Sequence, residues 1–260
     1  IELCFFSTKS DLVSLQHPKL DHIMEINYCR AGRLGWKMGK GNQIYLGPGD
    51  FSLHTMDACV DSTLRFPTER YEGLTLCIDL NQLSEHPPDL LIGTNITREL
   101  FEKKFWQNGA FASFAGNTQT DSIFSGFYEQ PEHLRMTYQK IKSIELLLYL
   151  SQMDTKNKGR LTEYQLEQEE IVREIHEYLT KHIGKRITIE ALTQQYPINP
   201  TTLKAVFKSV YGNSLAAHIK EHRMEEAAKL LLETDLTMAE IGQQVGYESQ
   251  SKFTSAFKAY

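Results

Sequence analysis

The sequence predicts an α+β protein in which an antiparallel β-barrel with helices precedes an all-α region. Residues 5–80 contain short runs that alternate apolar and polar side chains between Gly- and Pro-containing turns, the pattern of half-buried strands. After about Leu90 the apolar residues recur at helical spacing, and near the C-terminus one pair of short helices occurs twice. A chain of 260 residues is long enough for two domains, each with its own core.

Composition narrows the class of protein. With 41% hydrophobic and 23% charged residues, the chain is an ordinary globular sequence, which excludes a disordered tail or a collagenous repeat. The longest apolar runs fall far short of the roughly 20 residues that cross a bilayer, so no membrane partner is expected. Four separated cysteines without a Cys-x-x-Cys pair predict reduced, mostly buried thiols in a cytoplasmic protein that has no zinc site.

The strands predict a barrel in the first half. Met24, Ile26 and Tyr28 alternate with polar residues, and the same alternation returns over residues 74–80. The run 43–54, with Gly-Pro-Gly-Asp in its middle, resembles the turn that enters a strand in cupin-like jelly rolls, so residues 1–152 are expected to form a cupin-like domain. Metal-dependent cupins hold their metal with several His and Glu ligands, whereas His54 stands alone here. Neither a metal nor another cofactor is therefore expected.

A barrel of this kind can hold a small organic molecule. Aromatic and sulfur-bearing linings suit many ligands, and binding would favour one arrangement of the protein, so the first domain is expected to sense an effector. The alternative is that the same side chains are plain barrel core. The candidate ligand-binding residues are Tyr28, Trp36, His54 and Met56.

A long helix is expected after Pro131, a residue that suits a first helical turn. Its apolar stripe either packs against the barrel or pairs with a second copy of the chain, which would make the protein a homodimer. The dimerisation candidates are Leu134, Tyr138, Ile141, Ile144 and Leu148. The polar stretch that begins at Met153 predicts a linker over residues 153–170.

The remaining residues, 171–260, contain an internal repeat. Residues 188–196 match residues 237–245, and Leu203 and Phe207 then match Phe253 and Phe257. Each copy has a Thr N-cap, a short amphipathic helix, a turn and a second helix with apolar residues four apart. The repeat therefore predicts two helix-turn-helix units, at about 188–208 and 237–258.

Two segments of this region resemble the AraC/XylS family of bacterial transcription regulators. The first is Tyr-Gly-Asn-Ser at 211–214, which leads into the helix at 222–231. The second is Ile-Gly-x-x-Val-Gly-Tyr at 241–247, followed by Phe253, Ala256 and Phe257. Residues 125–147 are also faintly similar to the siderophore-responsive branch of that family. The resemblance implies a sequence-specific DNA-binding regulator that places two recognition helices in successive major grooves, with RNA polymerase as a candidate partner.

The polar flanks of the two recognition helices are the expected contacts to double-stranded DNA. Gln can pair with adenine through two hydrogen bonds, and Lys can donate to guanine or to phosphate. The candidates are Thr201, Thr202, Lys204 and Lys208 in the first unit, and Gln250, Ser251, Lys252, Thr254 and Ser255 in the second. Ala205 and Ser255 stand where relatives often have a long Arg, which puts direct base readout there in doubt. Any DNA contact must be a local patch, because the residues after Tyr164 include 11 basic and 13 acidic side chains.

An enzyme is the competing class. A cupin-type metal enzyme fused to a helical domain is the alternative, but the sequence lacks Gly-x-Ser-x-Gly, a phosphate loop and His-Glu-x-x-His. His176, His182, His218 and His222 fall on expected helices and are interpreted as scattered surface or capping residues. We therefore expect a regulator and no enzymatic activity.

Overall fold

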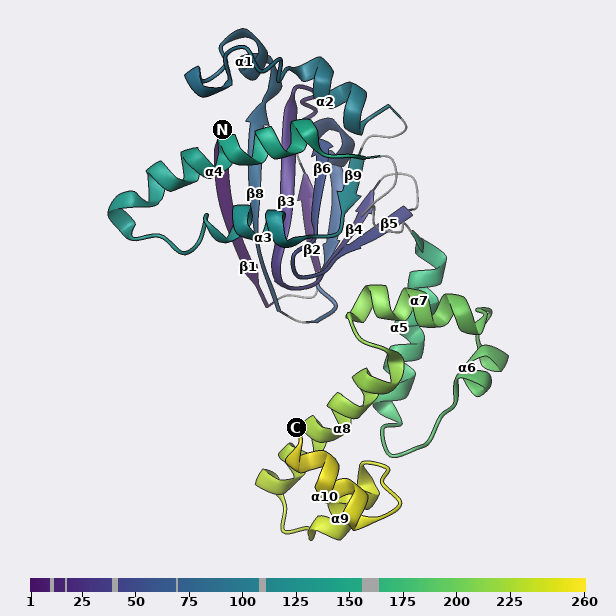
Figure 1. The fold of residues 1–260 in the computed structure, drawn as a ribbon. Coiled ribbons are helices and arrows are strands. Elements are labelled where there is room, and N and C mark those ends of the chain that lie inside the picture. Colours follow the sequence, from purple (N-terminus) through teal and green to yellow (C-terminus); the bar gives the residue numbers. More distant parts are fainter. Residues whose placement is uncertain (10–11, 17, 39–41, 69, 108–110, 156–163) are drawn as a thin grey trace. The chain divides into compact units, whose positions relative to one another are not determined.

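The computed structural model divides the chain into two units, Ile1–Glu163 and Tyr164–Tyr260. It describes residues 1–9, 12–16, 18–38, 42–68, 70–107, 111–155 and 164–260. The first unit contains antiparallel sheets with helices and the second is helical (Figure 1), in the order that the sequence predicted. The linker was expected to extend to residue 170, whereas helix α5 already begins at Leu166. Residues 156–163 of that linker lie outside the described residues.

Two antiparallel sheets form the centre of the first unit. In the first sheet the neighbouring strands are β1 (Glu2–Thr8), β8 (Tyr71–Asp79), β3 (Ile23–Gly32), β6 (Phe51–Thr55) and β9 (Phe111–Phe114). In the second they are β5 (Asn42–Leu46), β4 (Leu34–Met38), β7 (Asp61–Arg65) and β2 (Leu12–Gln16). Within the described segments no strand pair joins one sheet to the other. The two sheets are therefore open, and the closed cupin-like barrel expected from the sequence is not confirmed.

Strand β3 shows how the sheet separates two cores. Met24, Ile26 and Tyr28 face the helices and belong to a large buried cluster, as their alternation predicted. Cys29 faces the second sheet and belongs to a separate cluster with Trp36. The helices over the outer face of the first sheet (Figure 1) are α1 (Leu80–Glu85), α2 (Arg98–Phe105), α3 (Thr118–Ser125) and α4 (Glu132–Gln152). Short 3-10 helices lie at Met56–Cys59 (η1) and Asp89–Leu91 (η2).

Helix α4 begins directly after Pro131 and divides its apolar stripe between core and solvent. Ile144 and Leu148 pack against the large core cluster. Leu134, Tyr138 and Ile141 are 39%, 37% and 50% exposed. The first turns of α4 extend past the edge strand β1 (Figure 1), in keeping with the exposure of these three residues.

The second unit consists of helices after the short strand β10 (Tyr164–Gln165). They are α5 (Leu166–Lys181), α6 (Ile189–Gln195), α7 (Pro200–Tyr211), α8 (Leu215–Glu233), α9 (Met238–Gln244) and α10 (Gln250–Lys258). The Thr188 side chain caps α6, and Thr237 forms a capping box with Glu240 at α9, so both expected Thr caps are present. The core residues of the repeat are buried as predicted, with Phe257 partly buried: Leu192, Leu203, Phe207, Ile241, Val245, Phe253 and Phe257.

The cysteines are free thiols, as expected. Cys29 and Cys59 are buried and Cys77 is half-buried, whereas Cys4 is exposed. Burial raises the pKa of the Cys29 thiol to about 12, which keeps it protonated near neutral pH. Across the described ranges, the helices lack the combination of length and apolarity that a membrane crossing requires.

Candidate nucleic-acid interface

Helix α7 presents one buried and one polar face. The Asn199 side chain accepts a hydrogen bond from the backbone N–H of Thr202 at 2.9 Å and caps the helix, and Pro200 occupies its first position. Leu203 and Phe207 are fully buried. The predicted contacts Thr201, Lys204 and Lys208 are exposed on the other side, and so is Ala205.

Thr202 differs from the other candidates of this helix. It is half-buried, and its hydroxyl oxygen accepts a hydrogen bond of 2.9 Å from Asn199 Nδ2. Thr202 therefore belongs to the cap of α7, and its hydroxyl keeps its proton and one acceptor lone pair for another molecule.

Helix α10 repeats the arrangement of α7. The Ser249 hydroxyl accepts a hydrogen bond from the Lys252 backbone N–H at 3.3 Å and caps the helix, while Phe253 is fully buried beneath it. The exposed candidates of this helix are Gln250, Ser251, Lys252 and Ser255, and Thr254 is half-buried. Both helices thus point their apolar residues inward and leave their polar flanks exposed.

Charge distinguishes these two helices from the rest of the unit. Helices α7 and α10 contain four lysines and no Asp or Glu. The acidic residues gather elsewhere, above all on α5 and α8, which have no recognition role in the predicted scheme. The unit as a whole has more acidic than basic residues, yet the two exposed flanks are locally positive. A negatively charged polymer would therefore be attracted to α7 and α10 rather than to the unit in general.

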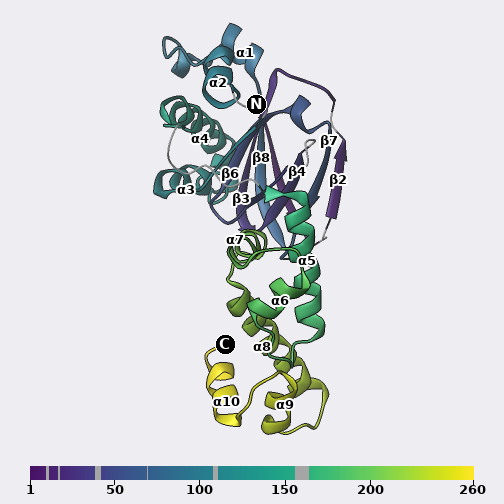
Figure 2. The same ribbon diagram turned by 90° about the vertical axis from the view of Figure 1, so that its right-hand side faces the viewer.

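Helix α8 separates the two helix-turn-helix units. It has 19 residues, which at a rise of 1.5 Å per residue gives a length of about 28 Å. Figure 1 and Figure 2 both show α7 near one end of α8 and α9 and α10 near the other. Equivalent major grooves on one face of DNA are about 34 Å apart, which is comparable with this helix plus its flanking turns.

Two arginines that the sequence analysis did not single out lie next to the second helix pair. The Arg186 guanidinium is 87% exposed and lies 3.9 Å from Glu248, which is itself 4.0 Å from Lys252 Nζ. Arg223 on α8 donates from Nε to the carbonyl oxygen of Ile183 at 2.9 Å and from Nη1 to that of Gly246 at 3.3 Å. Both residues border a hollow of about 420 Å³ beside Lys252. Their role depends on tertiary packing, for which no local sequence signal exists.

The first unit holds a cavity between its two sheets. It has a volume of about 310 Å³ and includes two of the four predicted ligand-binding residues, Trp36 and Met56. Most of its wall is apolar, and Glu25, Asn27 and Ser62 add polar groups. Tyr28 does not line it, because its ring stacks on Phe124 at 4.1 Å on the opposite face of the first sheet.

His54 is fully buried beside this cavity. The sequence suggested that it stands alone, whereas in the structure Glu25 and Cys59 lie beside it. Its Nε2 lies 2.7 Å from Glu25 Oε2, and the Cys59 thiol donates to the same carboxylate oxygen at 3.7 Å. Glu25 and His54 are directly paired across strands β3 and β6. Glu25 could not be found from the sequence, because its pairing with His54 requires the strand register.

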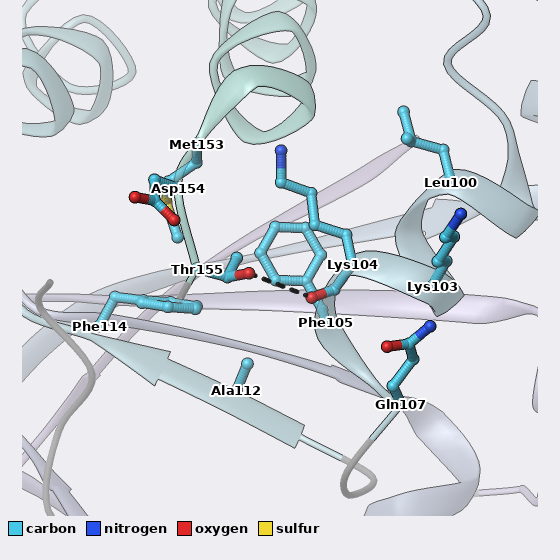
Figure 3. A pocket seen from close by; sticks show the side chains of 10 residues that line it. All are labelled: Leu100, Lys103, Lys104, Phe105, Gln107, Ala112, Phe114, Met153, Asp154 and Thr155. Atoms are coloured by element: carbon cyan, nitrogen blue, oxygen red, sulfur yellow. Dashed lines mark hydrogen bonds between the residues drawn. The ribbon is translucent and has the colours of Figure 1, made fainter. Parts of the chain in front are cut away.

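A second hollow of the first unit is a cleft of about 680 Å³ lined by α2, β9 and the segment that follows α4. Figure 3 shows Lys104 and Phe105 on one side and Met153 to Thr155 on the other, with a hydrogen bond from the Thr155 hydroxyl to the Lys104 carbonyl oxygen. The cleft contains none of the predicted ligand-binding residues. Among the lining residues that the structure describes, the single carboxylate is that of Asp154, which is exposed, whereas the cavity between the sheets has the buried Glu25.

A helix-turn-helix domain family matches residues 192–260. The HTH-type transcriptional regulator ExsA of Pseudomonas aeruginosa is 32% identical over 87 residues, which are 34% of this chain and only 31% of ExsA. The crystal structure of fatty-acid-bound ToxT from Vibrio cholerae aligns with 99% of this chain and 90% of its own, at 14% identity and a TM-score of 0.41.

The HTH-type transcriptional activator AarP of Providencia stuartii is 30% identical over 93 residues, which cover 36% of this chain and 69% of AarP. The helix-turn-helix family match spans residues 192–260, which include the segments that carry the family resemblance in the sequence. The chain therefore belongs to the AraC/XylS family of transcription regulators.

Proposed function

We propose that the protein regulates transcription by binding double-stranded DNA sequence-specifically, with α7 and α10 in successive major grooves of one duplex. The observation that carries this proposal is the pair of exposed, lysine-bearing flanks without acidic residues on α7 and α10. Their caps and buried faces make both helices rigid supports for these side chains.

The side chains divide by their chemistry. Lys204, Lys208 and Lys252 are long and exposed, so they suit phosphate oxygens or guanine. Gln250 lies in the first turn of α10, where an amide can make two hydrogen bonds with adenine. The remaining candidates have hydroxyl groups that reach only a short distance: Thr201, Ser251, Thr254 and Ser255. Thr202 contributes mainly through the cap of α7. Ala205 and Ser255 offer no long side chain, so part of the specificity would come from the shape of the DNA.

We further propose that residues 1–152 sense a small-molecule effector in the cavity between the sheets. The apolar wall favours an apolar body, and the Glu25 carboxylate favours a hydrogen-bond donor or a positive group on the ligand. Trp36 and Met56 supply contact area there.

The exposed residues Leu134, Tyr138 and Ile141 support a homodimer formed through the first half of α4, with Ile144 and Leu148 fixing the helix to its own core. RNA polymerase is the further partner that we propose for the DNA-bound dimer.

The DNA-binding role is tested by selecting fragments of the source genome with the purified full chain and measuring binding to the recovered sequence by fluorescence anisotropy. The variant Lys204→Glu/Lys252→Glu, which places acidic charge on both recognition helices, is expected to lose binding. Lys140→Glu/Lys181→Glu makes the same change in net charge at exposed positions on α4 and α5 and should bind like the wild type. Equal binding by all three proteins would remove α7 and α10 from the interface.

A further inference from the structure

Three histidines meet inside the second unit, contrary to the expectation that they are scattered. His176 lies on α5, and His218 and His222 lie one turn apart on α8. Each offers a ring nitrogen within 4.8 Å of the others, and the Nε2 atoms of His218 and His222 are 3.0 Å apart. All three are half-buried. Proposed DNA contacts do not include any of them.

The surroundings orient the three rings. Glu225 Oε2 lies 3.0 Å from His222 Nδ1, which leaves His222 Nε2 directed at His218. The Tyr211 ring stacks on His176 at 4.3 Å with an interplanar angle of 22°. His176 Nε2 is buried and has no hydrogen-bond partner among the residues that the structure describes. A buried nitrogen without a partner is costly unless something outside the protein chain satisfies it.

The donor set fits a metal ion. Two His at i and i+4 on one helix, joined by a third from a neighbouring helix, form a three-imidazole site that leaves a fourth position open. Around a tetrahedral Zn²⁺ with Zn–N distances of about 2.0–2.1 Å, ligand nitrogens lie about 3.4 Å apart, close to the separation of His218 and His222. A carboxylate on the far nitrogen of His222 is the usual outer partner of a metal-bound imidazole. The absence of a carboxylate oxygen from the three donors argues against Mg²⁺ or Ca²⁺.

We propose that His176, His218 and His222 bind one Zn²⁺ ion, which ties helix α5 to helix α8. No metal was expected from the sequence, because His54 stood alone, the cysteines lacked zinc-site spacing, and these histidines were interpreted as scattered surface or capping residues. The site links α8, which separates the two helix-turn-helix units, to α5, the first helix of the unit Tyr164–Tyr260 (Figure 2). Zn²⁺ is therefore expected to stabilise the second unit whether or not DNA is its partner.

The test uses the full chain after removal of metal with a chelator. Zn²⁺ is titrated by calorimetry, Co²⁺ serves as a spectroscopic substitute because tetrahedral Co²⁺ absorbs strongly in the visible range, and Tm is measured with and without Zn²⁺. The wild type is expected to bind one Zn²⁺ per chain and to gain Tm. His218→Gln/His222→Gln is expected to lose both effects.

Two controls identify the site. His182→Gln changes another histidine of this unit, whose Nδ1 lies 2.8 Å from the Tyr178 carbonyl oxygen, and should keep full binding. Cys59→Ser alters the separate group of Glu25, His54 and Cys59 in the first unit and should also keep it. A wild type that gains no Tm from Zn²⁺, or binding that survives His218→Gln/His222→Gln, overturns the proposal. If Zn²⁺ binding survives in His218→Gln/His222→Gln but is lost in Cys59→Ser, the metal site belongs to the first unit.

If the double variant does not fold, as judged by its far-UV circular dichroism, Glu225→Gln provides a milder change. Glu225 is exposed and acts through His222 as a positioning residue. Its replacement is expected to weaken Zn²⁺ binding roughly ten- to hundredfold while the metal-free Tm stays unchanged. Unchanged Zn²⁺ affinity in Glu225→Gln contradicts the proposed orientation of His222.

Discussion

Arg223 lies directly against Gly246, and its Nη1 donates a hydrogen bond of 3.3 Å to the Gly246 carbonyl oxygen. The same guanidinium donates from Nη2 to the Lys185 carbonyl oxygen at 3.0 Å. One side chain of α8 thus joins the loop after α5 to the turn between α9 and α10. This contact fixes the second helix pair relative to the helix that separates it from the first.

Glycine is needed at position 246 for two reasons, its backbone conformation and the close approach of neighbouring atoms. A comparison with Gly93 separates the two. Its φ is +83°, a conformation that favours glycine, and an added Cβ would lie 2.8 Å from Arg223 Nη2 and 2.8 Å from the Gly184 carbonyl oxygen. Gly93 has a φ of +79° with no atom within 4 Å of an added Cβ. Gly93→Ala should therefore lower the free energy of unfolding by about 1 kcal/mol, and Gly246→Ala by about 2–3 kcal/mol. Urea denaturation measures both, and equal losses would show that the close approach has no cost.

Gln250→Ala and Lys252→Ala should weaken DNA binding in different ways. If Gln250 reads a base, its loss costs about 1–3 kcal/mol of binding free energy and relaxes the preference at one base pair. If Lys252 contacts phosphate, its loss weakens all sequences alike and lowers the salt slope by about one. Binding to the selected sequence and to single-base variants, measured over a range of salt concentrations, distinguishes the two. Identical salt slopes for the wild type and Lys252→Ala would place Lys252 away from phosphate.

The helix pairs could be predicted in detail because their signals are local. The caps at Thr188 and Thr237 and the apolar residues four apart lie within a few positions of each other, and local spacing decides a helix and its buried face. The closure of the barrel could not be predicted this way. Alternation assigns residues such as Met24 to one face of a strand, but it does not say whether the edge strands of two sheets pair.

The two clusters that contain histidine were missed because they depend on contacts between residues far apart in the sequence. Glu25 and His54 face each other only because β3 and β6 pair in one register. The spacing of His218 and His222 was visible in the sequence and could have indicated a shared helix face, but the approach of His176 depends on the packing of α5 against α8. Chemistry that depends on contacts between distant residues therefore needs the structure.

Ser62→Ala is expected to leave the first unit as stable as the wild type, or more stable by up to about 1 kcal/mol. Ser62 is 5% exposed in the wall of the cavity between the sheets, and its hydroxyl has no hydrogen-bond partner among the described residues. Removing a buried, unsatisfied hydroxyl eliminates its desolvation cost. The free energy of unfolding of the ligand-free protein, measured in urea, checks this. A loss of 1 kcal/mol or more would show that the hydroxyl is satisfied in solution.

The Cys29 thiol should make the stability fall at high pH. Burial raises its pKa from 9.0 to about 12, with Asp50 adding to this and Arg33 opposing it. The unfolded chain therefore releases the proton first as pH rises. The contribution of Cys29 is fully present below pH 9.0 and declines between pH 9.0 and about 12, by up to about 1.4 kcal/mol per pH unit. Urea denaturation across this range should give a shallower decline for Cys29→Ala than for the wild type, and parallel curves would contradict the shifted pKa.

The first half of α4 should hold two copies of the chain together. Leu134, Tyr138 and Ile141 recur at helical spacing on one side of the helix, and Ile141 is 50% exposed, so a carboxylate at that position would be trapped in an apolar interface. In light scattering, Ile141→Glu is therefore expected to be a monomer and the wild type a dimer. The Tm of the single chain is expected to stay unchanged by the substitution. Met136→Glu is the matched control, because Met136 is 67% exposed and lies about half a turn away from that stripe. A wild type that is monomeric, or dimers that survive Ile141→Glu but not Met136→Glu, would assign the interface to another surface.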